Sequence, residues 1–207
     1  MTAIAVHGRG ASADDILSLA REIGAAESGA HSSARLSARL SDVAFLAPEA
    51  ASHTWYPLSF LAPIERNEPW LTSALSTIER LVTTLGSQGI SSDRIALLGF
   101  SQGACLALEF AARHPRRYAA VIAFSGGLIG PPGTPRTYTG SLEGTPVFLG
   151  CSDVDPHIPV DRVRESAAVL KEMHASVDAR IYPRMGHTIN QEELLVARGL
   201  LGRKSSG

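Results

Sequence analysis

Short, almost wholly apolar runs alternate along this chain with segments in which apolar residues recur at helical spacing. Runs of this kind are typical of strands that are covered on both faces, as in a parallel sheet. The alternation therefore predicts an α/β fold, with helices in two layers around a mostly parallel sheet of about six strands. The strands are predicted over residues 2–6, 42–47, 94–98, 118–124, 146–149 and 177–182.

The segments between these strands have the period of amphipathic helices. A long apolar stripe predicts one helix over residues 71–85. Ser12 and Asp15, three positions apart, form a capping pair at the start of an expected helix that continues to residue 23. Further helices are predicted over residues 104–113 and 163–174.

The size and charge of the chain limit what it can be. A chain of 207 residues, 44% of them hydrophobic, can bury roughly 70% of its unfolded surface, and we expect a single domain over residues 1–207. The net charge of −1 creates no field that would gather nucleic acid or an anionic membrane, so a small-molecule substrate is expected. No apolar run reaches the ~18 residues of a membrane span, and the start lacks a signal-peptide pattern. These features predict a soluble, cytoplasmic protein.

The two cysteines, Cys105 and Cys151, both lie in apolar surroundings. Two such residues are more typical of buried thiols in a reducing compartment than of a disulfide framework. No metal ion and no cofactor are predicted, and nothing in the sequence specifies an oligomeric state.

The segment Gly99-Phe100-Ser101-Gln102-Gly103 lies between a predicted strand and a predicted helix. Small residues on both sides of Ser101 are what a sharp strand-to-helix turn requires, since it brings backbone segments close together. Such a turn would place the Ser101 hydroxyl at a helix N-terminus, where developing negative charge is stabilised. A serine that merely caps the helix is the alternative, but the strand before it and the helix after it favour a nucleophile.

A serine nucleophile needs a base, and that base needs an orienting acid. His187 follows the last predicted strand, at the sheet edge where ligand-facing groups of parallel sheets gather. His114 and His174 fall at helix ends or surfaces and are better explained as solvated or capping residues. Asp153 and Asp155 both follow the preceding strand, and spacing alone does not choose between them.

Two backbone N–H groups are expected to receive the negative charge that acyl transfer builds on a carbonyl oxygen. Gln102, which follows the nucleophile, should supply one. Arg9, in the segment His7-Gly8-Arg9-Gly10 after the first strand, should supply the other. The same glycines could form a simple turn or a phosphate-binding loop, but the Gly-Lys-Ser/Thr ending of a Walker loop is absent.

Together these segments resemble the phospholipase/carboxylesterase family of α/β hydrolases, which includes the acyl-protein thioesterases. The resemblance covers nearly the whole chain, and Asp155-Pro156-His157-Ile158-Pro159 matches the family pattern around its acid. It implies a triad of Ser101, Asp155 and His187, with oxyanion donors from Arg9 and Gln102, and leaves Asp153 to brace the loop. It also implies an N-terminally trimmed α/β-hydrolase fold, and Arg9 replaces the aliphatic residue that relatives often carry.

Two loops bear on the substrate. The segment 125–145 has several Gly and Pro and no helical period, so no cap domain is expected. The longer insertion 48–69 carries apolar side chains that could line an acyl groove or simply pack onto the sheet. The substrate contacts predicted on this basis are Trp55, Tyr56 and Phe60, with His157 as a neighbour of the site.

The expected function is a serine carboxylesterase for short- to medium-chain esters, with thioesters and lysophospholipids as further substrates that the resemblance admits. An acyltransferase would use the same triad with an acceptor other than water. A non-catalytic binding protein usually lacks a triad member, and none is missing here. A cysteine-dependent hydrolase is disfavoured because the turn holds Ser101.

Overall fold

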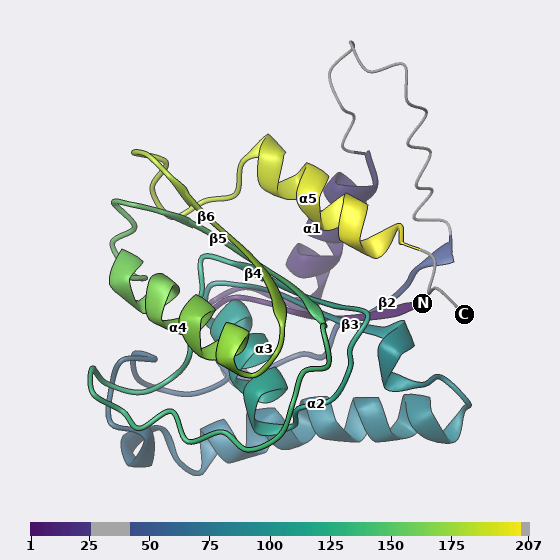
Figure 1. The fold of residues 1–207 in the computed structure, drawn as a ribbon, viewed down its shortest axis with the longest axis horizontal. Helices are drawn as coiled ribbons and strands as arrows, with labels where there is room; N and C mark the ends of the chain where they lie inside the picture. The colour runs from purple at the N-terminus through teal and green to yellow at the C-terminus, as the bar shows by residue number, and fades with distance from the viewer. Residues whose placement is uncertain (26–41, 204–207) are drawn as a thin grey trace.

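The computed structural model describes residues 1–25 and 42–203, and in them six strands form one sheet in the order β2-β1-β3-β4-β5-β6. All five neighbouring pairs are parallel, so the predicted parallel sheet of six strands is confirmed (Figure 1). The first half of the chain contributes the strands on one side of the sheet and the second half those on the other. The strands are β1 (Thr2–Val6), β2 (Ala44–Leu46), β3 (Ile95–Phe100), β4 (Ala120–Phe124), β5 (Pro146–Ser152) and β6 (Ser176–Tyr182).

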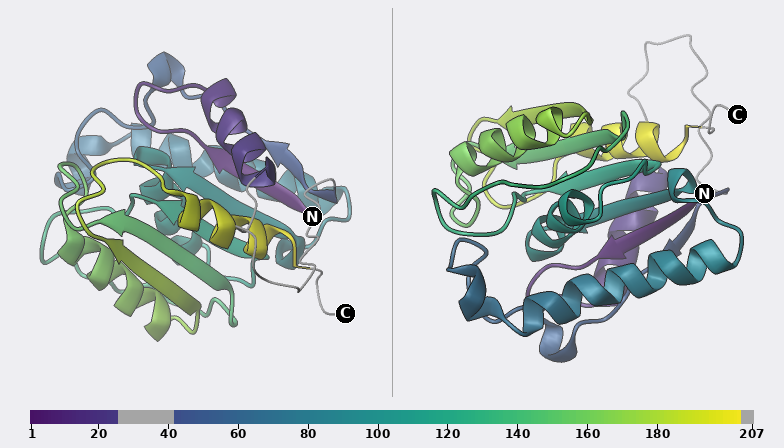
Figure 2. Two further views of the ribbon diagram at one scale, coloured as in Figure 1. Left: turned by 90° about the horizontal axis from the view of Figure 1, so that it is seen from above. Right: turned by 60° about the horizontal axis from the view of Figure 1, so that its bottom comes forward.

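Helices cover both faces of the sheet and complete three layers (Figure 2). Two helices lie on one face: α1 (Ala13–Ala25) and α5 (Gln191–Leu201). Three helices lie on the other: α2 (Trp70–Ser87), α3 (Gln102–Arg113) and α4 (Val160–Glu172). Short 3₁₀ helices occur at η2 (Ala51–His53), η3 (Ile64–Asn67) and η4 (Ser92–Arg94).

The alternating side chains of the strands divide the core in two. Ile4 and Val6 of β1 pack into the layer shared with α2, α3 and α4, whereas Ala3 and Ala5 face α1 and α5. Both faces are covered over the central strands β3 and β4, so these strands are apolar throughout. The edge strand β6 is less buried and carries the charged residues Asp178 and Arg180. The capping pair of α1 is also confirmed, since Asp15 accepts from the Ser12 backbone N–H at 2.8 Å.

Residues 125–145 join β4 to β5, and this described segment contains no helix, as its glycines and prolines predict. In the described part of the chain no helix combines the length and apolarity needed to cross a bilayer. Cys105 and Cys151 are both buried free thiols.

The first turn of α5 contains a buried carboxyl group. Asn190 and Glu193 form a capping box, in which the Asn190 backbone N–H donates to Glu193 Oε2 at 2.9 Å. The other oxygen, Oε1, is buried and has no hydrogen-bond partner among the described residues. Burial disfavours the charged form and raises the pKa of Glu193 to about 7.

A Glu193→Gln variant should change how stability depends on pH. A carboxyl pKa that is higher in the folded state contributes stability at acidic pH, and that contribution is lost as pH rises through about 7. We therefore expect the free energy of unfolding of the variant, relative to that of wild type, to rise by on the order of 2–3 kcal/mol between pH 5 and pH 8. One pKa unit corresponds to about 1.4 kcal/mol. Urea unfolding of both proteins at the two pH values measures this, and parallel pH profiles would contradict it.

Candidate active site

The turn between β3 and α3 holds Ser101 in a strained conformation, with φ of 55° and ψ of −118°. The glycines on both sides permit it. A Cβ atom on Gly103 would lie 2.0 Å from the carbonyl oxygen of Val6, and one on Gly99 would lie 2.4 Å from the Gly103 carbonyl. The turn is therefore possible only without side chains at these positions, and it places the Ser101 hydroxyl at the start of α3.

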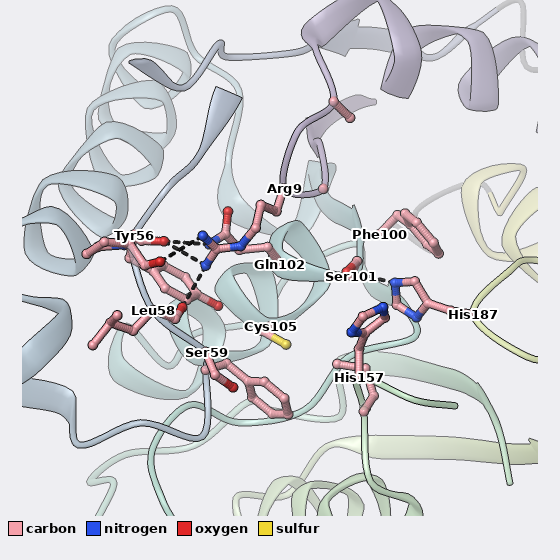
Figure 3. Close-up of a pocket in the computed structure, with 15 residues that line it drawn as sticks. Arg9, Tyr56, Leu58, Ser59, Phe100, Ser101, Gln102, Cys105, His157 and His187 are labelled. Carbon is pink, nitrogen blue, oxygen red and sulfur yellow. Dashed lines mark hydrogen bonds between the residues drawn. The ribbon is translucent and has the colours of Figure 1, made fainter. Parts of the chain in front are cut away.

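His187 lies against this hydroxyl. Its Nε2 is 2.9 Å from Ser101 Oγ (Figure 3). Its Nδ1 is 2.7 Å from Asp155 Oδ2. The three side chains come from loops after β3, β5 and β6, which end at the same edge of the sheet. They form one continuous chain of hydrogen bonds from a carboxylate through an imidazole to a hydroxyl.

Asp155 is held as a carboxylate. Its side chain is fully buried, and this burial opposes ionisation. Three hydrogen bonds outweigh the burial, one from His187 and two from the backbone N–H groups of His157 and Ile158, so the pKa of Asp155 lies below its usual value. A negatively charged acceptor therefore faces His187 Nδ1.

Asp153 has a different place. Its Oδ1 accepts from the backbone N–H of Arg184 at 2.7 Å, in the loop that carries His187. Ser152, the last residue of β5, adds bonds from the backbone N–H groups of Met185 (3.1 Å) and Gly186 (3.0 Å). The two side chains brace the histidine loop, and sequence reasoning missed Ser152 because it expected β5 to end at residue 149.

The two expected oxyanion donors lie beside Ser101. Gln102 is the first residue of α3, so its backbone N–H has no acceptor within the helix. Arg9 lies in the loop after β1, and the next backbone N–H, of Gly10, is bonded to His53 O at 2.7 Å. Among the described residues neither the Arg9 N–H nor the Gln102 N–H donates to an acceptor, which leaves both as candidate oxyanion donors.

A cavity of about 590 Å³ opens beside the hydroxyl of Ser101. Tyr56, Phe60 and His157 line it, as the sequence suggested, together with Arg9 and Cys105 (Figure 3). Burial raises the pKa of the Cys105 thiol to about 12, so at neutral pH this thiol is protonated and does not compete with the serine as a nucleophile.

Trp55 is the one predicted substrate contact that does not line the cavity. Its ring is buried, packs 5.0 Å from the ring of His7, and donates from Nε1 to the His7 carbonyl at 2.9 Å. The prediction that Trp55 touches substrate is therefore corrected. Trp55 instead packs against the loop that follows β1 and is hydrogen-bonded to it. The insertion 48–69 thus both packs onto the core and lines the cavity.

His114, one of the histidines set aside in the sequence analysis, lies away from this site. His114 follows the last residue of α3, at the opposite end from Ser101, and pairs with Glu79 at 3.5 Å. In residues 1–25 and 42–203 no group of three His, Cys, Asp or Glu side chains is arranged to hold a metal ion.

The chain is similar in sequence to known hydrolases. The model of the phospholipase/carboxylesterase family matches residues 2–201. Acyl-protein thioesterase 1 of Saccharomyces cerevisiae is 28% identical over 125 residues, which are 59% of this chain and 55% of that protein. The chain thus spans about half the length of the curated relatives it matches.

The similarity to solved structures covers nearly the whole chain. A phospholipase/carboxylesterase from Dyadobacter fermentans superposes with a TM-score of 0.87 and 39% identity, over 98% of this chain and 90% of that one. The esterase PE8 superposes with a TM-score of 0.75 and 25% identity, over 97% and 90%.

Asp155→Asn should lower kcat/KM for a short nitrophenyl ester by about 10⁴-fold, because the amide neither holds the His187 tautomer nor stabilises its protonated form. Asp153→Asn retains an oxygen that can accept from Arg184 N–H, so the loss of kcat/KM in this variant should stay below about 10-fold. Steady-state kinetics of both variants, with melting temperatures as the folding control, test this. A larger loss in the Asp153 variant would reverse the assignment of the two acids.

Proposed function

We propose that this chain, which belongs to the phospholipase/carboxylesterase family, is a serine esterase that works through an acyl-enzyme. The observation that carries the proposal is the hydrogen-bond chain from Asp155 through His187 to Ser101. A structural serine cap would not need a buried carboxylate and an imidazole aligned on its hydroxyl.

The geometry supports a two-step reaction. Ser101 Oγ attacks the ester carbonyl carbon while His187 Nε2 takes the hydroxyl proton, and the carboxylate of Asp155 stabilises the imidazolium that forms. The carbonyl oxygen becomes negative between the backbone N–H groups of Arg9 and Gln102. Collapse expels the alcohol, which takes the proton from His187. Water then attacks the acyl group by the same proton transfers and releases the acid and the free serine.

The cavity supports short- to medium-chain carboxylic esters as substrates, with thioesters also in range. Its volume of about 590 Å³ lies within the usual range for small-molecule sites. Apolar groups such as Leu58, Phe60 and Ile158 dominate its lining. Thioesters are included because similar proteins bear the name acyl-protein thioesterase. Activity on long-chain substrates with none on short ones would contradict this substrate range.

Ser101→Ala should lower kcat for nitrophenyl butyrate by about 10⁶-fold, the loss typical of removing a serine nucleophile, and should abolish labelling by a fluorophosphonate probe. Ser87→Ala is the matched control, because Ser87 is exposed at the end of α2 and does not line the cavity, so this variant should keep both activity and labelling. Labelling that survives in the Ser101 variant would overturn the nucleophile.

A further inference from the structure

One side of the cavity is formed by residues 56–60, here called the cavity wall. The side chain of Arg9 lies across it and donates to three successive carbonyl groups. Its Nη1 bonds to Pro57 O at 2.8 Å, and its Nη2 bonds to Tyr56 O at 2.9 Å and to Leu58 O at 2.6 Å (Figure 3). A guanidinium is a rigid planar fork, so it fixes the spacing of these three carbonyls, which an ammonium group cannot do.

A second side chain beside the nucleophile holds the same wall. Gln102 Nε2 donates to Tyr56 O at 2.8 Å, and Gln102 Oε1 accepts from the backbone N–H of Trp55 at 3.0 Å. The two residues whose backbone N–H groups we assign to the oxyanion thus also contact the wall through their side chains.

Asn67 is a third side chain that holds the wall. This side chain is fully buried; its Oδ1 accepts from Leu58 N–H at 2.9 Å, and its Nδ2 donates to Ser59 O at 3.0 Å. Burying an amide is favourable only when it is hydrogen-bonded, and both bonds of Asn67 go to the wall. Three side chains, those of Arg9, Gln102 and Asn67, are therefore hydrogen-bonded to the wall.

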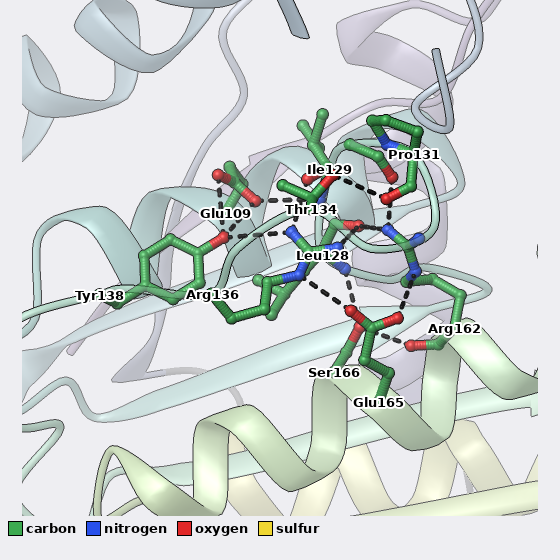
Figure 4. A network of polar contacts seen from close by, with 11 residues as sticks. Glu109, Leu128, Ile129, Pro131, Thr134, Arg136, Tyr138, Arg162, Glu165 and Ser166 are labelled. Atoms are coloured by element: carbon green, nitrogen blue, oxygen red, sulfur yellow. Dashed lines mark hydrogen bonds and ion pairs between the residues drawn. The ribbon is translucent and has the colours of Figure 1, made fainter. Parts of the chain in front are cut away.

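The last residue of the wall is tied to the loop 125–145. Gly130 N–H donates to Phe60 O at 2.7 Å, and Gly130 O in turn accepts from the buried Arg162 of α4 at 2.6 Å. Figure 4 shows how Arg162 and Arg136 share Glu165 and reach the carbonyls of this loop. The wall is thus anchored to the α3 and α4 layer as well as to the nucleophile turn.

We propose that Arg9 and Asn67 are positioning residues that fix the cavity wall and thereby set the size of the group the cavity accepts. The inference rests on the proposed esterase function and deepens it. Because the backbone groups of the wall are hydrogen-bonded along its length, the wall cannot move outward to admit a longer acyl chain. In a pocket of fixed shape, one misfitted methylene changes kcat/KM by about 10–200-fold.

The test is a chain-length series of nitrophenyl esters from acetate to decanoate, measured as kcat and KM for each. The kcat/KM of the wild-type protein should rise to a maximum with chain length. It should then fall by about 10-fold or more at the first ester whose acyl chain no longer fits. In Arg9→Met and Asn67→Ala this fall in kcat/KM should shrink to about 3-fold or less. The KM for the preferred ester should rise by about 10-fold, with a smaller change in kcat.

Three comparisons make the test specific. Arg9→Lys keeps the charge but not the fork and should resemble Arg9→Met; restoration of the wild-type profile would show that charge matters and would overturn the inference. Arg164→Met, a change at an exposed arginine of α4, should leave the profile unchanged. If Asn67→Ala fails to fold by circular dichroism, the exposed Arg9 side chain still decides the question.

The failure of this inference is distinguishable from failure of the proposed function. If the wild-type protein neither hydrolyses esters nor reacts with a fluorophosphonate probe, the proposed esterase function itself is wrong. Folded Arg9 and Asn67 variants that label normally and keep the wild-type chain-length profile overturn the positioning role alone.

Discussion

The close approach of the first turn of α3 to the end of β1 is the constraint on which the site depends. Gly103 lies so near the carbonyl of Val6 that no Cβ atom fits between them. This contact places Ser101 at the start of a helix and brings the loop of Arg9 beside Gln102. One backbone contact thus positions the nucleophile and both candidate oxyanion donors, before any side chain contributes.

The parallel sheet supplies the rest of the reacting groups. Because all strands point the same way, the loops after β3, β5 and β6 meet at one edge, and each carries one member of the hydrogen-bonded triad. This is why so much could be predicted from sequence. The apolar runs fix the strands, and the residues directly after them must share that edge. Asp155 needed the family resemblance, since Asp153 follows the same strand; its bond to His187 now supports that choice.

Side-chain contacts between distant segments were beyond sequence reasoning. Trp55 and Tyr56 are adjacent aromatic residues in one loop, yet only Tyr56 reaches the cavity, because Trp55 finds an acceptor at His7 O. Asn67 and Ser152 bind backbone groups of other loops, and such bonds have no periodic signature. Arg9 was expected to contribute its backbone N–H, and the three carbonyls of the cavity wall that its guanidinium bonds were not predicted.

The proposed reaction requires that Ser101 becomes acylated during turnover. Acid quenching of the protein within milliseconds of mixing with an activated nitrophenyl ester, followed by peptide mass spectrometry, tests this directly. The expected result is one acyl group on the peptide that contains Ser101, formed together with a burst of about one equivalent of nitrophenol per site. An acyl group on Cys105 or any other residue, with Ser101 unmodified, would contradict it.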